Sequence, residues 1–143
     1  MKRTLSQVVA GQTVISASAE TTVRTAAITM AQKNIGAVVI VDSFGKLIGL
    51  FTERDVLNRV VARGLDPDTT PLSLVMTEKL QTCTPDKPLG HALHMMFEGG
   101  FRHVPVVDDG KPIGMVSARN ALGPEIVAFE AELKERDHIA EIL

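Results

Sequence analysis

Residues 37–57 read AVVIVDSFGKLIGLFTERDVL, and residues 104–122 read VPVVDDGKPIGMVSARNAL. The two stretches align at an offset of 66 residues, which falls to 65 after Asp42 because the second copy lacks one turn residue. The repeat continues upstream, where Ala26 and Met30 recur as Ala92 and Met96. Self-similarity at a fixed period indicates repeated structural units. Because two copies are too few for a solenoid, we expect them to pack on each other as one pseudo-symmetric unit.

The spacing of apolar residues predicts the same order of elements in both copies. Short β-favouring runs cover 12–16 and 80–84, and apolar residues at helical spacing cover 22–33 and 88–99. Two further β-runs follow in each copy, joined by turns that contain Asp and Gly: 37–41 with 47–51, and 104–107 with 112–116. A second helix is predicted over 53–63 and 118–122, and a short helical turn over 72–76. Each copy is therefore predicted to be a β-α-β-β-α unit.

Beyond the Gly123-Pro124 step, residues 125–143 predict a charged amphipathic helix with an incomplete apolar stripe. The stripe consists of Ile126, Phe129, Leu133 and Ala140. Two roles are open for this helix: packing against its own domain, or contact with a second copy or a partner protein.

The composition indicates one folded domain and excludes several partners. The chain has 143 residues, 45% hydrophobic and 22% charged, and its net charge of −2 offers no basic face for nucleic acid. The longest apolar stretch, 35–41, is too short to cross a bilayer, so we expect no membrane association. The first residues do not resemble a secretory signal, and we expect a cytoplasmic protein. The single cysteine, Cys83, excludes an internal disulfide and fits a reducing compartment.

Both copies end on the pattern Gly-x-x-(Thr/Ser)-x-x-(Asp/Asn), at residues 49–55 and 114–120, where a predicted strand meets a predicted helix. Free N–H groups at a helix start favour phosphate. A carboxylate such as Asp55, one turn further on, can accept both hydroxyls of a ribose. Arg54 and Arg119 could donate charge-assisted bonds to phosphate oxygens. The pattern therefore suits a nucleotide.

The same residues also have the spacing of a helix capping box. Thr52 with Asp55, and Ser117 with Asn120, match that pattern when Asp and Asn replace the usual Glu or Gln. Either motif alone is explained by capping, and the duplication on a matched framework is what favours a ligand site.

Both copies resemble cystathionine β-synthase (CBS) motifs, and the chain resembles a stand-alone CBS pair, or Bateman module. The resemblance covers about residues 5–122 and rests on the apolar strand with its Asp–Gly hairpin, the motif above, and the run RHVPVVD at 102–108. It implies an α/β (α+β) fold of two βαββα motifs packed on each other, plus the C-terminal helix. The boundaries we expect are 1–66 for motif 1, 67–123 for motif 2 and 124–143 for the helix.

The resemblance also implies a function. CBS pairs are non-catalytic regulatory modules that bind adenosyl ligands (AMP, ADP, ATP, NAD or S-adenosylmethionine) in clefts between the motifs, and they commonly form dimers. No cofactor is required. The expected partners are the ligand, a second copy of the chain and a regulated protein that the sequence does not name. The residues carried over by the motif are Gly36, Ala37, Thr52, Arg54, Asp55, Arg102, His103, Ser117, Arg119 and Asn120.

Two features predict that the sites differ. Asn120 stands where the family usually has Asp, and a neutral amide loses the charge-assisted part of a bond to a ribose, so we expect Asp55 to bind ribose more strongly. Arg102, His103 and Arg119 all lie in the second copy, which predicts a more cationic second site that prefers more phosphate.

Other functions were weighed against this one. A purely structural or oligomerising module would have the same fold with empty clefts. A metal-binding stress protein would use the second-copy residues Cys83, His91, His94 and His103, although buried and surface roles explain each of them. No nucleophile–base pattern stands out, so we expect no enzymatic activity.

Overall fold

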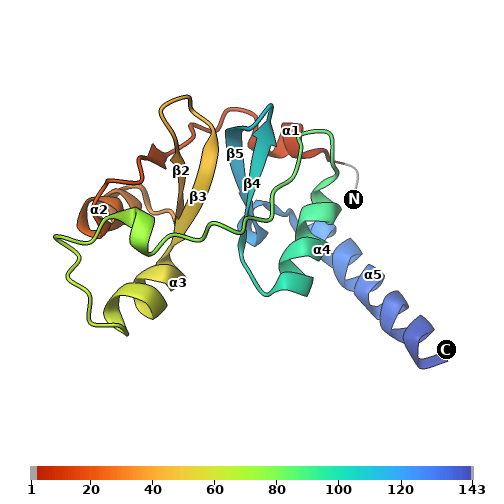
Figure 1. Ribbon diagram of the computed structural model, residues 1–143. Coiled ribbons are helices and arrows are strands. Elements are labelled where there is room, and N and C mark those ends of the chain that lie inside the picture. Colours follow the sequence, from red (N-terminus) through yellow and green to blue (C-terminus); the bar gives the residue numbers. More distant parts are fainter. Residues whose placement is uncertain (1–2, 143) are drawn as a thin grey trace.

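The two copies of the repeat form two small sheets that stand side by side at the centre of the molecule (Figure 1). The computed structural model describes residues 3–142, and side chains as far as residue 137. In the first sheet β2 (Ala37–Val41) lies between a parallel β1 (Ser16–Ala17) and an antiparallel β3 (Leu47–Thr52). The second sheet is the hairpin of β4 (His103–Asp108) and β5 (Lys111–Ser117). Both predicted hairpins are confirmed.

Each hairpin is preceded by the predicted helix. Helix α2 (Val23–Lys33) begins after Thr22, whose hydroxyl accepts a hydrogen bond from the Thr25 amide at 3.3 Å. Helix α4 (Leu89–Gly99) follows Pro88, whose missing N–H costs nothing at a helix start. These helices and the strands beside them enclose two separate apolar cores, one per repeat.

The predicted strand over 80–84 is wrong. Only Cys83 pairs with the sheet, in a parallel bridge to Val106, whereas in the first repeat β1 pairs over two residues. The Cys83 amide donates to Pro105 and its carbonyl accepts from Val107. The next bond of a parallel ladder would need the amide of residue 85, which is a proline without an N–H, so the ladder stops.

The second helices differ from prediction and from each other. In the first repeat α3 (Glu53–Asp55) continues as the π-helix η1 (Val56–Val61). In the second, the helix predicted over 118–122 is only the 3-10 turn η3 (Ala118–Asn120). A continuing helix would need an N–H from residue 124 for the Asn120 carbonyl, and Pro124 has none. The Arg3 guanidinium donates to that carbonyl instead, at 2.7 Å.

The segment that precedes each repeat in the sequence packs against the other repeat. Helix α1 (Leu5–Val9), which periodicity did not predict, buries Leu5 and Val9 in the core of the second repeat. Leu72 of the turn η2 (Leu72–Leu74) and the following Val75 and Met76 are buried in the core of the first repeat. Each segment therefore packs on the repeat that it does not precede in the sequence, and the expected boundaries 1–66 and 67–123 stay a prediction.

The last helix, α5 (Gly123–Ile142), leaves the body of the molecule beside α4 (Figure 1). Phe129 packs edge-on against His94 and Phe97 of α4, and Arg136 bonds Glu98. The first part of α5 thus packs against its own domain, although Val127 remains 67% exposed. Within the described residues no helix is long and apolar enough to span a membrane.

Candidate functional site

Three cavities lie where the two repeats meet, and His103 lines all of them. We name them by one residue each: the Asp55 cavity (about 480 Å³), the Asn120 cavity (about 470 Å³) and the central cavity (about 480 Å³), which contains Glu53 and Arg119. Such volumes are in the range of small-molecule sites.

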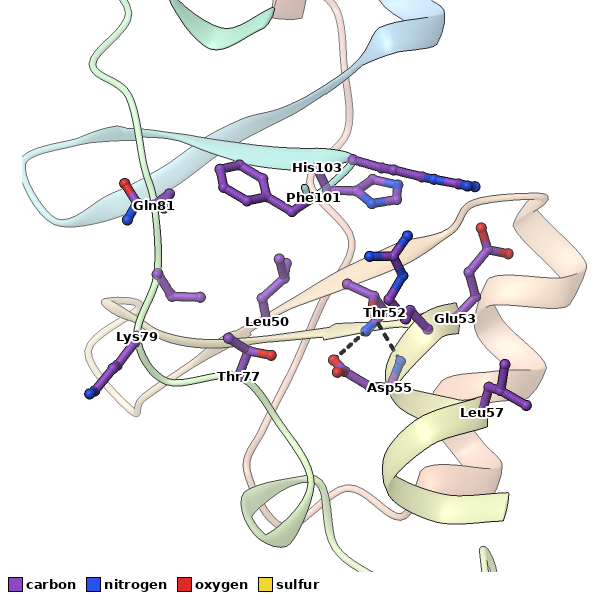
Figure 2. A pocket seen from close by; sticks show the side chains of 13 residues that line it. Leu50, Thr52, Glu53, Asp55, Leu57, Thr77, Lys79, Gln81, Phe101 and His103 are labelled. Carbon is purple, nitrogen blue, oxygen red and sulfur yellow. Dashed lines mark hydrogen bonds between the residues drawn. The ribbon is translucent and has the colours of Figure 1, made fainter. Parts of the chain in front are cut away.

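The Asp55 cavity is lined by both repeats and by the segment 77–81, which we call the connector. The strand-to-helix motif contributes Thr52, Arg54 and Asp55, and the start of β4 contributes Arg102 and His103. Figure 2 shows Phe101 and His103 on one side of the cavity, with Leu50, Thr52 and Asp55 on the other. The connector completes it with Thr77, Lys79, Leu80 and Gln81.

The Asn120 cavity repeats this arrangement with the repeats exchanged. The motif contributes Ser117, Arg119 and Asn120, and the start of β2 contributes Gly36 and Ala37. The N-terminal segment 12–15 takes the place of the connector. Every site residue predicted from the sequence therefore lines one of the cavities.

Of the three residues expected to make the second site cationic, His103 and Arg119 line the Asn120 cavity, and the prediction is wrong for Arg102. Arg102 lines the Asp55 cavity and the central cavity, and it does not line the Asn120 cavity, to which its repeat assigned it. Each cavity is lined by the motif of one repeat and by the start of the first hairpin strand of the other repeat, which is β4 for the Asp55 cavity and β2 for the Asn120 cavity. The segment 101–103 therefore stands across from Asp55, where the Asn120 cavity has the smaller, uncharged segment 35–37.

Both motifs form the capping boxes that their spacing predicted. The Asp55 carboxylate accepts a hydrogen bond from the Thr52 amide at 3.0 Å, and the Thr52 hydroxyl accepts one from the Asp55 amide at 3.2 Å (Figure 2). Asn120 Oδ1 accepts from the Ser117 amide at 2.7 Å. Capping and ligand binding are compatible, because the capped side chains also line the cavities.

Asp55 is buried, at 7% exposure, yet keeps acceptor capacity. Besides the Thr52 amide, its carboxylate contacts the Arg59 guanidinium at 3.5 Å. A carboxylate offers about four acceptor positions, so places remain for two hydroxyl groups. Asn120 differs: its oxygen also lies 3.4 Å from the Ser117 hydroxyl, which leaves the amide NH₂ as the group available to a ligand.

His103 lines all three cavities, and the charged groups around it affect its pKa. Burial lowers its pKa, the Glu53 carboxylate opposes that shift, and the Arg119 and Arg102 guanidinium groups add to it. A Cβ built on Gly36 would lie 3.1 Å from both the His103 Nε2 atom and a Glu53 carboxylate oxygen. The glycine therefore leaves room for two charged or polar side chains to approach the middle of the module.

The residues considered for a metal site, Cys83, His91, His94 and His103, do not form a metal-binding cluster. In the described part of the chain no three His, Cys, Asp or Glu side chains lie close enough to hold a metal ion. His94 instead faces α5, with Nε2 2.8 Å from the Glu132 carboxylate. Cys83 is buried, and burial raises the pKa of its thiol.

Sequence reasoning missed the residues that line each cavity from outside the motif. The signal was present, since the 66-residue offset maps 79–81 onto 13–15, and both stretches lie in or beside runs predicted as strands. The missed residues of the Asp55 cavity are Leu50, Glu53, Leu57, Thr77, Lys79, Leu80, Gln81 and Phe101. Those of the Asn120 cavity include Gln12, Thr13, Val14, Ile15, Ile35, Val39 and Met115.

The sequence model of the CBS domain matches residues 7–62 and 72–123. The chain belongs to the CBS domain family. CBSCBSPB1, a CBS domain-containing protein of Arabidopsis thaliana, is 40% identical over 126 residues, which are 88% of this chain and 23% of the relative. The chain thus spans less than a quarter of the length of such plant relatives.

Solved CBS structures share the fold. ATU1752 from Agrobacterium tumefaciens superposes with a TM-score of 0.75 at 29% identity, covering 82% of this chain and 94% of that one. The CBS domain pair of protein MJ0100 superposes with a TM-score of 0.73 at 26% identity, covering 82% and 90%. That pair was solved in complex with 5′-methylthioadenosine and S-adenosyl-L-methionine. The two-motif α/β architecture predicted from the sequence is confirmed.

Proposed function

We propose that this chain is a non-catalytic regulatory module that binds adenosyl ligands in the Asp55 and Asn120 cavities. The observation that carries the proposal is that both repeats line each cavity: the motif comes from one repeat, and the first strand of the hairpin comes from the other. A ligand that fills such a cavity contacts both repeats, so its binding energy depends on their relative position. The adenosyl compounds bound by the MJ0100 pair support this ligand class.

In this proposal the Asp55 cavity binds the ribose more tightly. The free acceptor positions of the Asp55 carboxylate receive the two ribose hydroxyls, with Thr52 beside them. Arg102 and His103 supply cationic or donor groups on the opposite wall and toward the central cavity, where a phosphate or other anionic group would lie, and Lys79 supplies a cation from the segment 77–81. The ligand class therefore includes AMP, ADP, ATP and NAD as well as S-adenosylmethionine.

The Asn120 cavity binds the same class with different contacts. The Asn120 NH₂ group donates where Asp55 accepts, so the bond to a ribose hydroxyl is neutral and weaker. Arg119 and the shared His103 are its charged and titratable groups.

The output is a change of conformation or of oligomeric state, transmitted to a regulated protein, and we propose that the working unit is a homodimer. A ligand shifts such an equilibrium only by its difference in affinity for the two states. A tenfold difference corresponds to about 1.4 kcal/mol, which one charge-assisted hydrogen bond can supply.

A thermal-shift titration with AMP, ATP, NAD and S-adenosylmethionine tests the proposal. A ligand at about 100 times its Kd adds about 2.7 kcal/mol of stability, which raises the Tm by several degrees. Circular dichroism or an extrinsic dye reports unfolding, because the chain has no Trp or Tyr.

Asp55→Ala should abolish most of the ligand-induced rise, and Asp55→Asn, which keeps a capping oxygen, should reduce it. Asp68→Ala is the matched control, because that aspartate is exposed and lies outside the cavities. A rise that survives Asp55→Ala and Asn120→Ala would contradict the assignment of these cavities. The absence of any rise with all four ligands would favour the structural or oligomerising alternative.

A further inference from the structure

The outer edge of β5 is closed by a side chain. Gln12 Nε2 donates to the Met115 carbonyl at 3.1 Å, and the Met115 amide donates to Gln12 Oε1 at 2.9 Å. Met115 stands opposite Pro105 in the hairpin, and proline cannot donate a bond across it. The two main-chain groups of Met115 therefore face outward and would be unpaired without Gln12 or water.

The matching edge of β3 is closed by main chain. Leu50 corresponds to Met115, and its outward amide and carbonyl bond the carbonyl and amide of Thr77 at 3.0 and 2.8 Å. At the place of Thr77 the N-terminal segment has Gly11, with φ +82°, and the chain turns there instead of pairing. The carboxamide of Gln12 then reproduces the donor and acceptor of a peptide group.

We propose that Gln12 is a positioning residue that sets the affinity of the Asn120 cavity. Gln12 and Met115 both line this cavity, and Gln12 leads directly into 13–15, which form its wall. The Gln12–Met115 pair holds this wall against β5. At its other end the wall is held by main chain, since the Val39 amide donates to the Ile15 carbonyl at 3.3 Å. Because Gln12 is exposed and its bonds involve a rotatable side chain, the contact of this wall with β5 opens more readily than the main-chain contact of Thr77 with β3. The inference rests on the proposed function.

Amide hydrogen exchange tests the closure without any ligand. In the Q12A variant the Met115 amide should exchange about tenfold faster, whereas the Leu50 amide should keep its rate. Q12E should speed this exchange less than Q12A does, because a carboxylate keeps the acceptor for the Met115 amide and loses only the donor to the Met115 carbonyl. Q32A is the matched control, since Gln32 is an exposed glutamine on α2 outside both cavities. Unchanged exchange at Met115 would overturn the closure.

Calorimetric titration with AMP tests the effect on binding. In an Asp55→Ala background, which isolates the Asn120 cavity, Q12A and Q12E should each weaken AMP binding about three- to tenfold, and Q32A should leave it unchanged. In the Asn120→Ala background, which isolates the Asp55 cavity, Q12A should have no effect. Equal weakening in both backgrounds indicates a general structural role and overturns the inference.

The remaining outcomes separate the two proposals. If Q12E binds AMP as tightly as the wild type, the bond from Gln12 to the Met115 carbonyl does not set the affinity and the positioning role is wrong. If the wild type binds AMP but the Asp55→Ala variant does not, the Asn120 cavity does not take AMP and the inference fails while the proposed function stands. If the wild type binds none of the adenosyl ligands, the proposed function fails together with the binding role of Gln12.

Discussion

Replacing Gly114 by alanine should destabilise the protein much more than the equivalent change at Gly49. The two glycines open the motifs of the two repeats, and each lies under the segment that precedes the other repeat in the sequence. A Cβ built on Gly49 would lie 2.6 Å from the sulfur of Met76. A Cβ built on Gly114 would lie 2.6 Å from Val9 Cγ1 and still closer to Val9 Cβ. Neither contact is tolerated, so a neighbour must move.

The neighbours differ in how readily they move. Methionine has three side-chain torsions and a polarisable sulfur, so Met76 can turn away from a methyl group at position 49. Valine is β-branched and holds one main rotamer in a helix, so a methyl group at 114 must displace the backbone of α1. Overpacking costs about 1–3 kcal/mol, and we place Gly114→Ala at the upper end and Gly49→Ala at the lower.

Thermal and urea unfolding followed by circular dichroism measure both variants. For a chain of this size the Tm should fall by about 6–10 °C for Gly114→Ala and by about 2–4 °C for Gly49→Ala. Val9→Gly removes the side-chain atoms that the new methyl group meets. In that background Gly114→Ala should cost less than about 0.5 kcal/mol, a coupling of about 2 kcal/mol between the two positions. Equal costs for the two glycine variants, or no coupling with Val9, would refute this reasoning.

Three further outcomes are expected. The pKa of His103 is lowered below its ordinary value of 6.5, chiefly by burial, so the unfolded chain takes up a proton first on acidification. The free energy of unfolding should therefore fall as the pH drops through 6.5, and His103→Gln should flatten that fall in melts between pH 5.5 and 7.5. Arg3→Ala removes bonds to Asn120 and Glu125 and should lower the Tm by about 2–4 °C, with Arg3→Lys intermediate because it cannot bind a carboxylate through two parallel N–H groups. Iodoacetamide should modify Cys83 slowly in the native protein and rapidly in denaturant, and equally fast native reaction would contradict its burial.

The elements that the sequence predicted well are those with local signals. Helix α2 and the strands of both hairpins begin and end within a residue or two of their predicted bounds, because hydrophobic period and turn residues specify them. Duplication strengthened each prediction, since every motif could be checked against its copy. The positions of the motif residues on cavity walls followed from the same pattern.

Two of the failures, at α1 and at Arg102, share one physical cause, which is contact between segments far apart in the chain. Helix α1 is five residues long, and the capping box of Thr4 with Gln7 that starts it was visible in the sequence. What holds the helix in place is burial of Leu5 and Val9 in the second repeat, which no local pattern encodes. The allocation of Arg102 failed for the same reason, because a residue's repeat does not tell which cavity its strand faces. The shortened helix at 118–122 is different: Pro124 was visible in the sequence, and its missing N–H explains why the turn stops at Asn120.

The two cavities lined by the duplicated motif have nearly equal volumes, but they differ in charge, in the size of the opposite segment and in how one wall is held. The Asp55 cavity has a carboxylate where we propose that the ribose binds, the larger segment 101–103 across from it, and main-chain bonds that join Thr77 to β3. The Asn120 cavity has a neutral amide, a smaller opposite segment, and a wall held by Gln12. Because tight binding needs a rigid, charged site and switching needs one that can move, we expect the Asp55 cavity to be filled first and the Asn120 cavity to respond to changes in ligand concentration. Two binding steps in a calorimetric titration with AMP, of which Asp55→Ala removes the tighter and Asn120→Ala the weaker, would establish this order.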